Sequence, residues 1–210
     1  MVHPSHPVEQ PVIRISFLTK RIDVFLLNSS MEKMSVGVIN FFSGKKDFRS
    51  LSNFWEHEVV IDGRLYESGE HGFHGEKYIR LSQMSEAAER KKQLWDYGQT
   101  FLKPSPYKTG AMVKRAGGKK GFALNPDELS RWFDISMDVQ RSICLWKKEN
   151  YEEVREDLRK SGANHLVHPA MRCSPEKLKD RIWEGKGAVV DGQIVVLGQN
   201  RLGNLWMEIR

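Results

Sequence analysis

Two short apolar segments of the chain each lead into an Asp-Gly pair and continue after it. Residues 59–61 precede Asp62-Gly63 and residues 64–66 follow it, and residues 188–190 and 193–197 flank Asp191-Gly192 in the same way. Glycine tolerates the positive φ that a type I′ turn requires, so this pattern is typical of a two-residue β-hairpin. The apolar pattern therefore predicts two small antiparallel hairpins.

Between and after the hairpins, apolar residues recur at three- and four-residue steps, which is the period of a helix packed on one face. The segments with this period are residues 73–95, 126–144, 151–158 and 202–209. Asn125 as N-cap with Pro126 at the first helical position marks one start, and Asn200 is placed to cap the terminal helix. Gly162 is expected to end the third helix as a left-handed C-cap. The predicted fold class is mainly α (α+β), without the alternating βαβ series of a large parallel sheet.

The length and composition fit one folded domain with an extension. Of the 210 residues, 40% are hydrophobic, and six Trp and ten Phe are enough to build a sizeable core. Residues 1–36 carry three early prolines and an irregular pattern, so they are expected to be a flexible N-terminal extension, and residues 37–210 the folded domain. The basic residues of the extension hint weakly at a transit peptide, against which its Glu9 and Asp23 argue.

The net charge indicates the kind of partner to expect, and the cysteine content indicates the cellular compartment. Thirty-three Lys and Arg against 27 Asp and Glu give a net charge of +6, which favours a polyanionic or phosphate-bearing partner. Cys144 and Cys173 have neither metal-ligand spacing nor the number of a disulfide framework, so an intracellular location, cytoplasmic or nuclear, is expected. The longest apolar run near the N-terminus, residues 24–27, is far shorter than the roughly 20 residues of a membrane span.

The densest polar segment, residues 67–77, opens the first expected helix. At about 100° per residue, Glu70, His74 and Lys77 share an arc of about 60° that continues to the apolar Leu81. Burial on that face lowers the pKa of a lysine and raises that of a glutamate, which are the shifts that produce a nucleophilic amine and a proton donor. The same pattern also fits two side chains that keep their charged ends in solvent at the edge of the core.

A metal site is not expected in this segment, and no cofactor is indicated. His71 and His74 lie three residues apart, whereas the zinc motif of metalloproteases places two histidines four apart with a glutamate directly after the first. Hydrogen-bonded structural histidines are the alternative.

Five short motifs follow one another in a fixed order along the chain. They are Leu51-Ser52-Asn53-Phe54, then Asp62-Gly63 with Tyr66, then Ser68-Gly69-Glu70-His71 through Phe73 and Lys77, then Asp180 to Trp183, and finally Asn200-Arg201-Leu202-Gly203-Asn204-Leu205-Trp206-Met207-Glu208-Ile209-Arg210. In this order they resemble the NADAR (YbiA-like) family over residues 38–210, with a poorer match over about 97–165. The resemblance implies a compact helical domain with a few short strands. It also implies an N-glycosidase that acts on phosphorylated riboflavin-pathway intermediates or on ADP-ribose attached to guanine.

Position by position, the resemblance implies roles for eleven residues. Glu70, Lys77 and Asp180 would be catalytic. The substrate-binding positions would be Ser52, Asn53, His71, His74, Trp183, Asn200, Arg201 and Gly203. Lys77 would form a Schiff base with the opened sugar while Glu70 or Asp180 moves protons, or else water activated by Glu70 would attack directly. Glu184 and His168 depart from the family's usual pattern, in which a glycine and an acid are common. Gly72 and His74 also depart from it, since they replace the usual aromatic residue and the usual Gln or similar residue of the Glu-His segment.

The leading hypothesis is a hydrolase that removes ADP-ribose from guanine bases of nucleic acid, because the basic charge favours contact with backbone phosphates. The expected partners are an ADP-ribose-bearing substrate and nucleic acid, with no membrane, and the pattern indicates no particular oligomeric state. Two alternatives stay open. One is an N-glycosidase of phosphorylated riboflavin-biosynthesis intermediates, and the other is a non-catalytic ADP-ribose-binding module, which the departures at Glu184 and His168 would permit.

Overall fold

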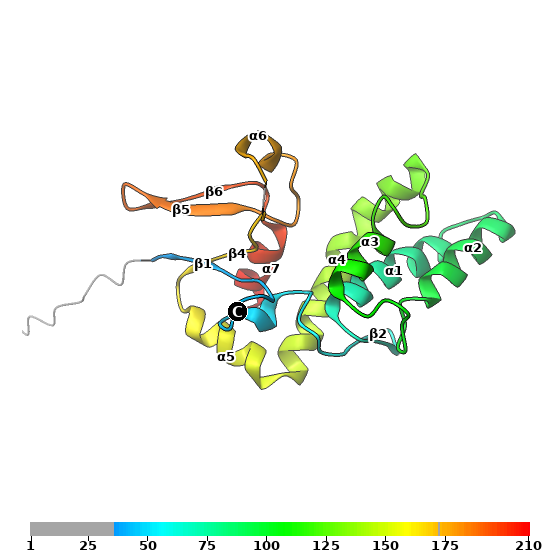
Figure 1. The fold of residues 1–210 in the computed structure, drawn as a ribbon, viewed down its shortest axis with the longest axis horizontal. Coiled ribbons are helices and arrows are strands. Elements are labelled where there is room, and N and C mark those ends of the chain that lie inside the picture. Colours follow the sequence, from blue (N-terminus) through cyan, green and yellow to red (C-terminus); the bar gives the residue numbers. More distant parts are fainter. Residues whose placement is uncertain (1–35, 172) are drawn as a thin grey trace, which may run out of the picture. The chain divides into compact units, whose positions relative to one another are not determined.

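The computed structural model describes residues 36–171 and 173–210 (Figure 1). The expected N-terminal extension and its transit-peptide interpretation therefore lie outside the described residues, apart from Val36. Helices predominate in the described part of the chain, and its strands are short, as the apolar pattern predicted. In this part of the chain, no helix is both long and apolar enough to cross a bilayer.

Both predicted hairpins are present, and each closes on its Asp-Gly pair. The φ angles are 48° at Asp62 and 76° at Gly63, and 50° at Asp191 and 75° at Gly192, so both turns use the left-handed region. A further pair of strands, which is parallel, was not predicted, because its two strands lie far apart in the sequence and no turn motif joins them. The strands are β1 (Val38–Asn40) with β4 (His165–Val167), β2 (Val59–Ile61) with β3 (Arg64–Tyr66), and β5 (Lys186–Val190) with β6 (Gln193–Leu197).

The helices largely follow the predicted segments, with differences at their ends. They are α1 (Gly69–Gln83), α2 (Ala88–Gln99), α3 (Gly110–Gly117), α4 (Pro126–Asn150), α5 (Glu152–Ser161), α6 (Pro175–Leu178) and α7 (Arg201–Ile209), with a short 3-10 helix at Arg49–Leu51. The predicted helix over 73–95 is two helices, because the chain turns at residues 84–87. Helix α3 was not predicted. Its second half overlaps residues 114–121, a basic glycine-rich segment whose composition is typical of a loop.

Three predicted helix ends can be compared with the structure. Asn125 and Glu128 form a reciprocal capping box at the start of α4, with both hydrogen bonds at 2.8 Å. Gly162 ends α5 with a φ of 49° and a ψ of −131°, so the glycine is at the helix end with a positive φ, but not in the left-handed helical conformation that was predicted. Asn200 does not cap α7: its side chain instead bonds Leu166 O and the backbone N–H of His168, at 2.9 and 3.0 Å.

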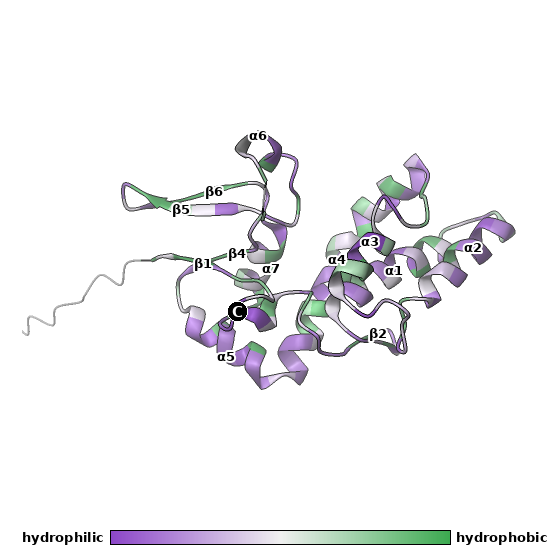
Figure 2. Cartoon of the chain, viewed as in Figure 1, coloured by the Kyte–Doolittle hydropathy of each residue, from purple (hydrophilic) through white to green (hydrophobic). Residues whose placement is uncertain are grey.

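The buried side chains form two clusters. The first lies among α1, α2, α3, α4 and the β2–β3 hairpin, where Gly75 lets α1 approach the ring of Tyr66 so closely that a Cβ there would lie 2.6 Å from it. The second joins α5, α7 and the β1–β4 pair, and Figure 2 shows the hydrophilic residues that cover much of α5. Trp183 packs against both clusters. A cavity beside Trp183 therefore takes its walls from both.

Candidate functional site

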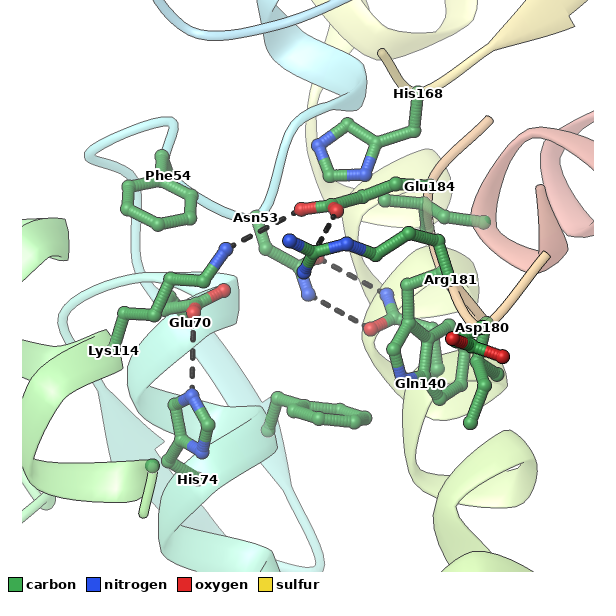
Figure 3. A pocket seen from close by; sticks show the side chains of 15 residues that line it. Asn53, Phe54, Glu70, His74, Lys114, Gln140, His168, Asp180, Arg181 and Glu184 are labelled. Atoms are coloured by element: carbon green, nitrogen blue, oxygen red, sulfur yellow. Dashed lines mark hydrogen bonds and ion pairs between the residues drawn. The ribbon is translucent and has the colours of Figure 1, made fainter. Parts of the chain in front are cut away.

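A cavity of about 370 Å³ lies beside Trp183, within the range of roughly 300–1,000 Å³ typical of ligand sites (Figure 3). Helices α1, α3, α4 and α7 and the segments 53–54 and 180–184 supply its walls. The lining residues are Asn53, Phe54, Glu70, Phe73, His74, Lys114, Gly118, Gln140, His168, Asp180, Arg181, Ile182, Trp183, Glu184 and Leu202. Five residues expected to act in the site, Asn53, Glu70, His74, Asp180 and Trp183, thus meet at one cavity.

Glu70 is held in the wall by the way α1 begins. Ser68 caps the helix, accepting the backbone N–H of His71 through its hydroxyl oxygen. The backbone N–H of Glu70 donates to Asn53 O at 2.9 Å, which ties the first turn of α1 to the segment before Phe54. The Glu70 residue is 7% exposed, and its Oε1 lies 3.2 Å from Nε2 of His74, one helical turn later.

The protonation states of Glu70 and His74 follow from this contact. Burial lowers the pKa of His74, and the carboxylate of Glu70 opposes that effect only in part. Burial alone raises the pKa of Glu70, but the hydrogen bond from His74 and the positive charges around it outweigh burial, so this pKa lies below its ordinary value. At neutral pH, Glu70 is therefore a carboxylate and His74 is neutral, and Nε2–H of His74 donates a hydrogen bond to the carboxylate. Among the described residues, Nδ1 of His74 has no hydrogen-bond partner.

Lys77 is buried but does not line the cavity. It is 7% exposed, its Nζ donates to the carbonyl of Gly117 at the end of α3, and the ammonium lies 4.6 Å from the centre of the Tyr78 ring. Burial lowers the pKa of Lys77 to about 8, against the opposing charge of Glu70. The alternative in which Glu70 and Lys77 keep their charged ends in solvent is therefore wrong. Glu70 and Lys77 were expected to project into one cavity, but only Glu70 lines it.

A pair of amide side chains, Asn53 and Gln140, also lines the cavity. The Asn53 amide donates to Gln140 at 2.7 Å, and the Gln140 amide donates back to Asn53 at 3.0 Å. Because both donors and both acceptors face each other, the two side chains hold one another in fixed orientations. Neighbouring Ser52 does not line this cavity: its hydroxyl accepts the backbone N–H of Phe54 at 3.2 Å.

Two aromatic rings form the apolar part of the wall. Phe73 and Trp183 meet edge to face, with ring centroids 5.2 Å apart and planes at 81°. A flat heterocycle fits against such surfaces, because its face can stack on an indole or phenyl ring. Asp180 lines the same cavity but is exposed, so its carboxylate lies at the solvent side.

Three charged residues form another part of the cavity wall. Glu184 lies 3.4 Å from Nζ of Lys114 and 3.5 Å from the guanidinium of Arg181. His168 lies beside them and stacks on Phe41, with ring centroids 5.5 Å apart. Burial lowers the pKa of His168, so it is a neutral imidazole at neutral pH. This side of the cavity therefore presents two cations held by one carboxylate.

Four residues expected to bind substrate do not line this cavity, and the structure shows the contacts that each makes within the fold. His71 bonds Ser68 Oγ and Tyr107 O, each at 2.9 Å, as a hydrogen-bonded structural histidine does. Asn200 joins α7 to β4 through the bonds already described, and the Arg201 guanidinium lies 4.9 Å from the centre of the Phe133 ring. A Cβ at Gly203 would lie 2.2 Å from Leu166 O, so this glycine permits close packing. These four predicted contacts with substrate do not involve the cavity wall.

Several lining residues were missed by sequence reasoning. Lys114 lies in the basic glycine-rich segment, which carried only a weak signal, and Gln140 lies inside a long helix with no signal. His168 and Glu184 stood out only as departures from the family pattern. Within residues 36–171 and 173–210, no group of three or more His, Cys, Asp or Glu side chains is arranged to hold a metal ion.

The sequence and the fold of the chain are similar to those of known proteins. No protein-family model matches the chain. The chain is 24% identical over 173 residues to proteins named N-glycosidase YbiA from Shigella boydii serotype 4 and from Escherichia coli strain K12, which covers 82% of this chain and 86% of each relative. It also matches the NMR structure of the E. coli protein YbiA with a TM-score of 0.52 and 22% identity, over 84% of each chain. The chain is YbiA-like, at low sequence identity, and the predicted NADAR (YbiA-like) assignment and mainly α fold are confirmed.

Proposed function

We propose that this YbiA-like chain is an N-glycosidase that removes ADP-ribose from guanine bases of nucleic acid, with Glu70 as its acid–base residue. The observation that carries the proposal is the carboxylate of Glu70, hydrogen-bonded by His74 at 3.2 Å in the wall of a ligand-sized cavity. The name of the relatives supports cleavage of a bond between a sugar carbon and nitrogen.

The charge state of Glu70 defines what it does first. Because its pKa lies below the ordinary value, Glu70 enters the reaction as a base that accepts a proton, and it returns that proton later as an acid. Nε2–H of His74 stabilises the charged form and orients the carboxylate. Asp180, at the solvent side, is the second candidate for moving protons.

One route passes through an imine on Lys77. A glycosylamine opens its sugar ring to an imine when a proton moves from nitrogen to the ring oxygen. The neutral amine of Lys77 then adds to the sugar C1, guanine leaves with its amino group restored, and water hydrolyses the lysine imine to free ADP-ribose and the amine. A pKa of about 8 leaves part of Lys77 neutral near physiological pH. This route requires Lys77 to leave the carbonyl of Gly117 and enter the cavity.

A second route needs no lysine in the cavity. The bond between C1 and the guanine nitrogen breaks as water adds to C1. Glu70 takes one proton of the water and returns it to the leaving nitrogen, so the carboxylate is regenerated. Glu70 already lines the cavity, so this route requires no rearrangement of α3. The two routes differ in whether a covalent adduct with Lys77 forms.

The cavity also supports the proposed substrate. Phe73 and Trp183 offer surfaces for a flat base, and Lys114 and Arg181 offer positive charge for phosphate groups. The net charge of +6 favours a nucleic acid over a small neutral substrate.

The test measures release of ADP-ribose from a single-stranded oligonucleotide that carries one ADP-ribosylated guanine, beside release of ribose phosphate from a phosphorylated ribosylamine of the riboflavin pathway. We expect faster release from the oligonucleotide, and a loss of about 10²-fold or more in Glu70→Gln. Glu208→Gln, an exposed residue paired with Arg141, is the control. Faster turnover of the ribosylamine would assign the substrate to that pathway, and binding of ADP-ribose without any turnover would make the chain a binding module.

The route is tested by borohydride reduction during turnover. The imine route predicts a stable adduct on the wild-type protein and none on Lys77→Arg. Lys114→Arg is the matched control, because Lys114 is the other amine beside Glu70 and lines the cavity. Full activity of Lys77→Arg without any adduct would exclude the imine route and support direct attack of water.

A further inference from the structure

A second cavity of about 390 Å³ adjoins the first. The two share five lining residues: Phe54, Lys114, His168, Arg181 and Glu184. Phe42, Ser52 and Met171 line the second cavity but not the first. The wall between the cavities is therefore built largely of the charged residues seen in Figure 3, not of packed apolar side chains.

The central element of that wall is the carboxylate of Glu184. It lies between Lys114 and Arg181, at 3.4 and 3.5 Å, and its side chain is 18% exposed while those of the two cations are 56% and 48% exposed. Both contacts are long for charged pairs, and ion pairs with such exposed partners contribute little to stability. A stronger anion can therefore replace Glu184 between the two cations.

We propose that Glu184 is a displaceable partition: a phosphate group of the substrate takes its place between Lys114 and Arg181, and the two cavities become one elongated site. This inference rests on the proposed function for the sugar that it places beside Glu70. A diphosphate carries more negative charge than a carboxylate, and the fork of an arginine matches two phosphate oxygens. With the sugar in the first cavity, whatever follows the phosphates lies in the second.

Glu184 then determines specificity in two ways. A neutral ligand cannot move it, because such a ligand gains nothing from the two cations, so the second cavity stays closed to it. A phosphate-bearing ligand enters but must separate Glu184 from both cations, so the carboxylate lowers the affinity for every anion that binds there. Removing its charge while keeping its size should therefore tighten anion binding selectively.

The test is calorimetric binding of inorganic pyrophosphate, ADP-ribose and adenosine to the full chain, with no turnover needed. Glu184→Gln should bind pyrophosphate and ADP-ribose about three- to tenfold more tightly than wild type, with adenosine unchanged. Lys114→Met and Arg181→Met should each weaken both anions about tenfold or more. Phe42→Trp, which fills the second cavity, should weaken ADP-ribose and leave pyrophosphate unchanged. Glu208→Gln removes an exposed carboxylate elsewhere and controls for net charge.

Thermal unfolding of each variant, with Glu184→Ala as a second substitution, checks that the fold is intact. The inference is overturned if Glu184→Gln binds pyrophosphate no more tightly than wild type, or if Lys114→Met and Arg181→Met leave its affinity unchanged. If Phe42→Trp lowers the affinities for pyrophosphate and ADP-ribose equally, the claim that the two cavities form one site is wrong. Tighter anion binding in Glu184→Gln without release of ADP-ribose from any oligonucleotide would support the partition and refute the proposed function, so the two failures are distinct.

Discussion

Lys147 offers a measurable case of a buried amine that has no place in the proposed chemistry. It is 1% exposed in α4, its Nζ donates to Ser52 O at 2.9 Å, and the rings of Trp55 and Trp206 lie 5.3 and 5.7 Å away. Burial lowers its pKa from 10.5 to about 8, against smaller opposing effects of Cys144 and Asp157. Its protonated form is therefore disfavoured in the folded chain.

The size of this effect follows from the two pKa values. In the unfolded chain Lys147 stays protonated up to about pH 10.5, whereas in the folded chain it loses its proton near pH 8. The free energy of unfolding therefore falls as the pH falls from about 10.5 to about 8, by about 3 kcal/mol, and this contribution stays constant below that range. Lys147→Met removes the penalty together with the bond to Ser52 O, which contributes about 1.5–3 kcal/mol.

The assay is denaturant unfolding followed by tryptophan fluorescence across this pH range, for wild type and Lys147→Met. We expect the difference in unfolding free energy between the two proteins to change by about 3 kcal/mol, with the variant relatively more stable at neutral pH and relatively less stable above about pH 10.5. Lys119→Met, which removes an exposed charge, controls for net charge. A difference that stays the same at both ends of the range would mean that Lys147 remains protonated in the folded chain and would refute the reasoning.

Three further predictions concern the site and its support. Activity should require the carboxylate form of Glu70, whose pKa is lowered from 4.5. The loss of kcat/KM at acid pH should therefore occur below pH 4.5, and a loss well above pH 4.5 would contradict this charge state. Glu76→Gln should lower the free energy of unfolding by about 3–5 kcal/mol in denaturant titrations, because the fully buried Glu76 accepts from Tyr66 at 2.7 Å and from Arg64 at 2.8 Å. Gly75→Ala should lower it by about 1–3 kcal/mol by forcing α1 away from Tyr66, whereas Ala at the uncrowded Gly63 meets only the strain of its positive φ.

Local signals in the sequence were sufficient for the elements that depend on a few neighbouring residues. The Asp-Gly turns and the capping box of α4 are set by residues within four positions of one another, so pattern and structure agree there. The parallel pairing of β1 with β4 joins residues 127 positions apart, and no local pattern encodes it. Asn200 shows the same limit, because its side chain bonds Leu166 of β4 and His168, which follows β4, and does not bond the end of the helix beside it.

In the candidate site too, features set by neighbouring residues were predictable and features set by distant residues were not. Helical spacing correctly placed Glu70 and His74 on one face, one turn apart, since α1 is regular there. It could not place Lys77 relative to the cavity, because that depends on α3, whose Gly117 carbonyl holds the amine. Equal lowering of the pKa to about 8 in Lys77 and Lys147 shows why a perturbed pKa alone does not identify a nucleophile. Access to the cavity distinguishes Glu70 from both amines.

The residues that line the cavity come both from motifs that match the YbiA-like family and from segments that do not match it. Asn53, Glu70 and Trp183 come from motifs that match the family, and they supply the carboxylate and the surfaces around it. Lys114 and Gln140 come from the middle of the chain, where the resemblance is poorest. His168 and Glu184 are departures from the pattern, yet both lie in the wall between the two cavities. Because the residues that differ surround the position where phosphate groups are proposed to bind, changes in substrate among YbiA-like proteins should depend on this wall, while the proposed acid–base residue, Glu70, stays the same.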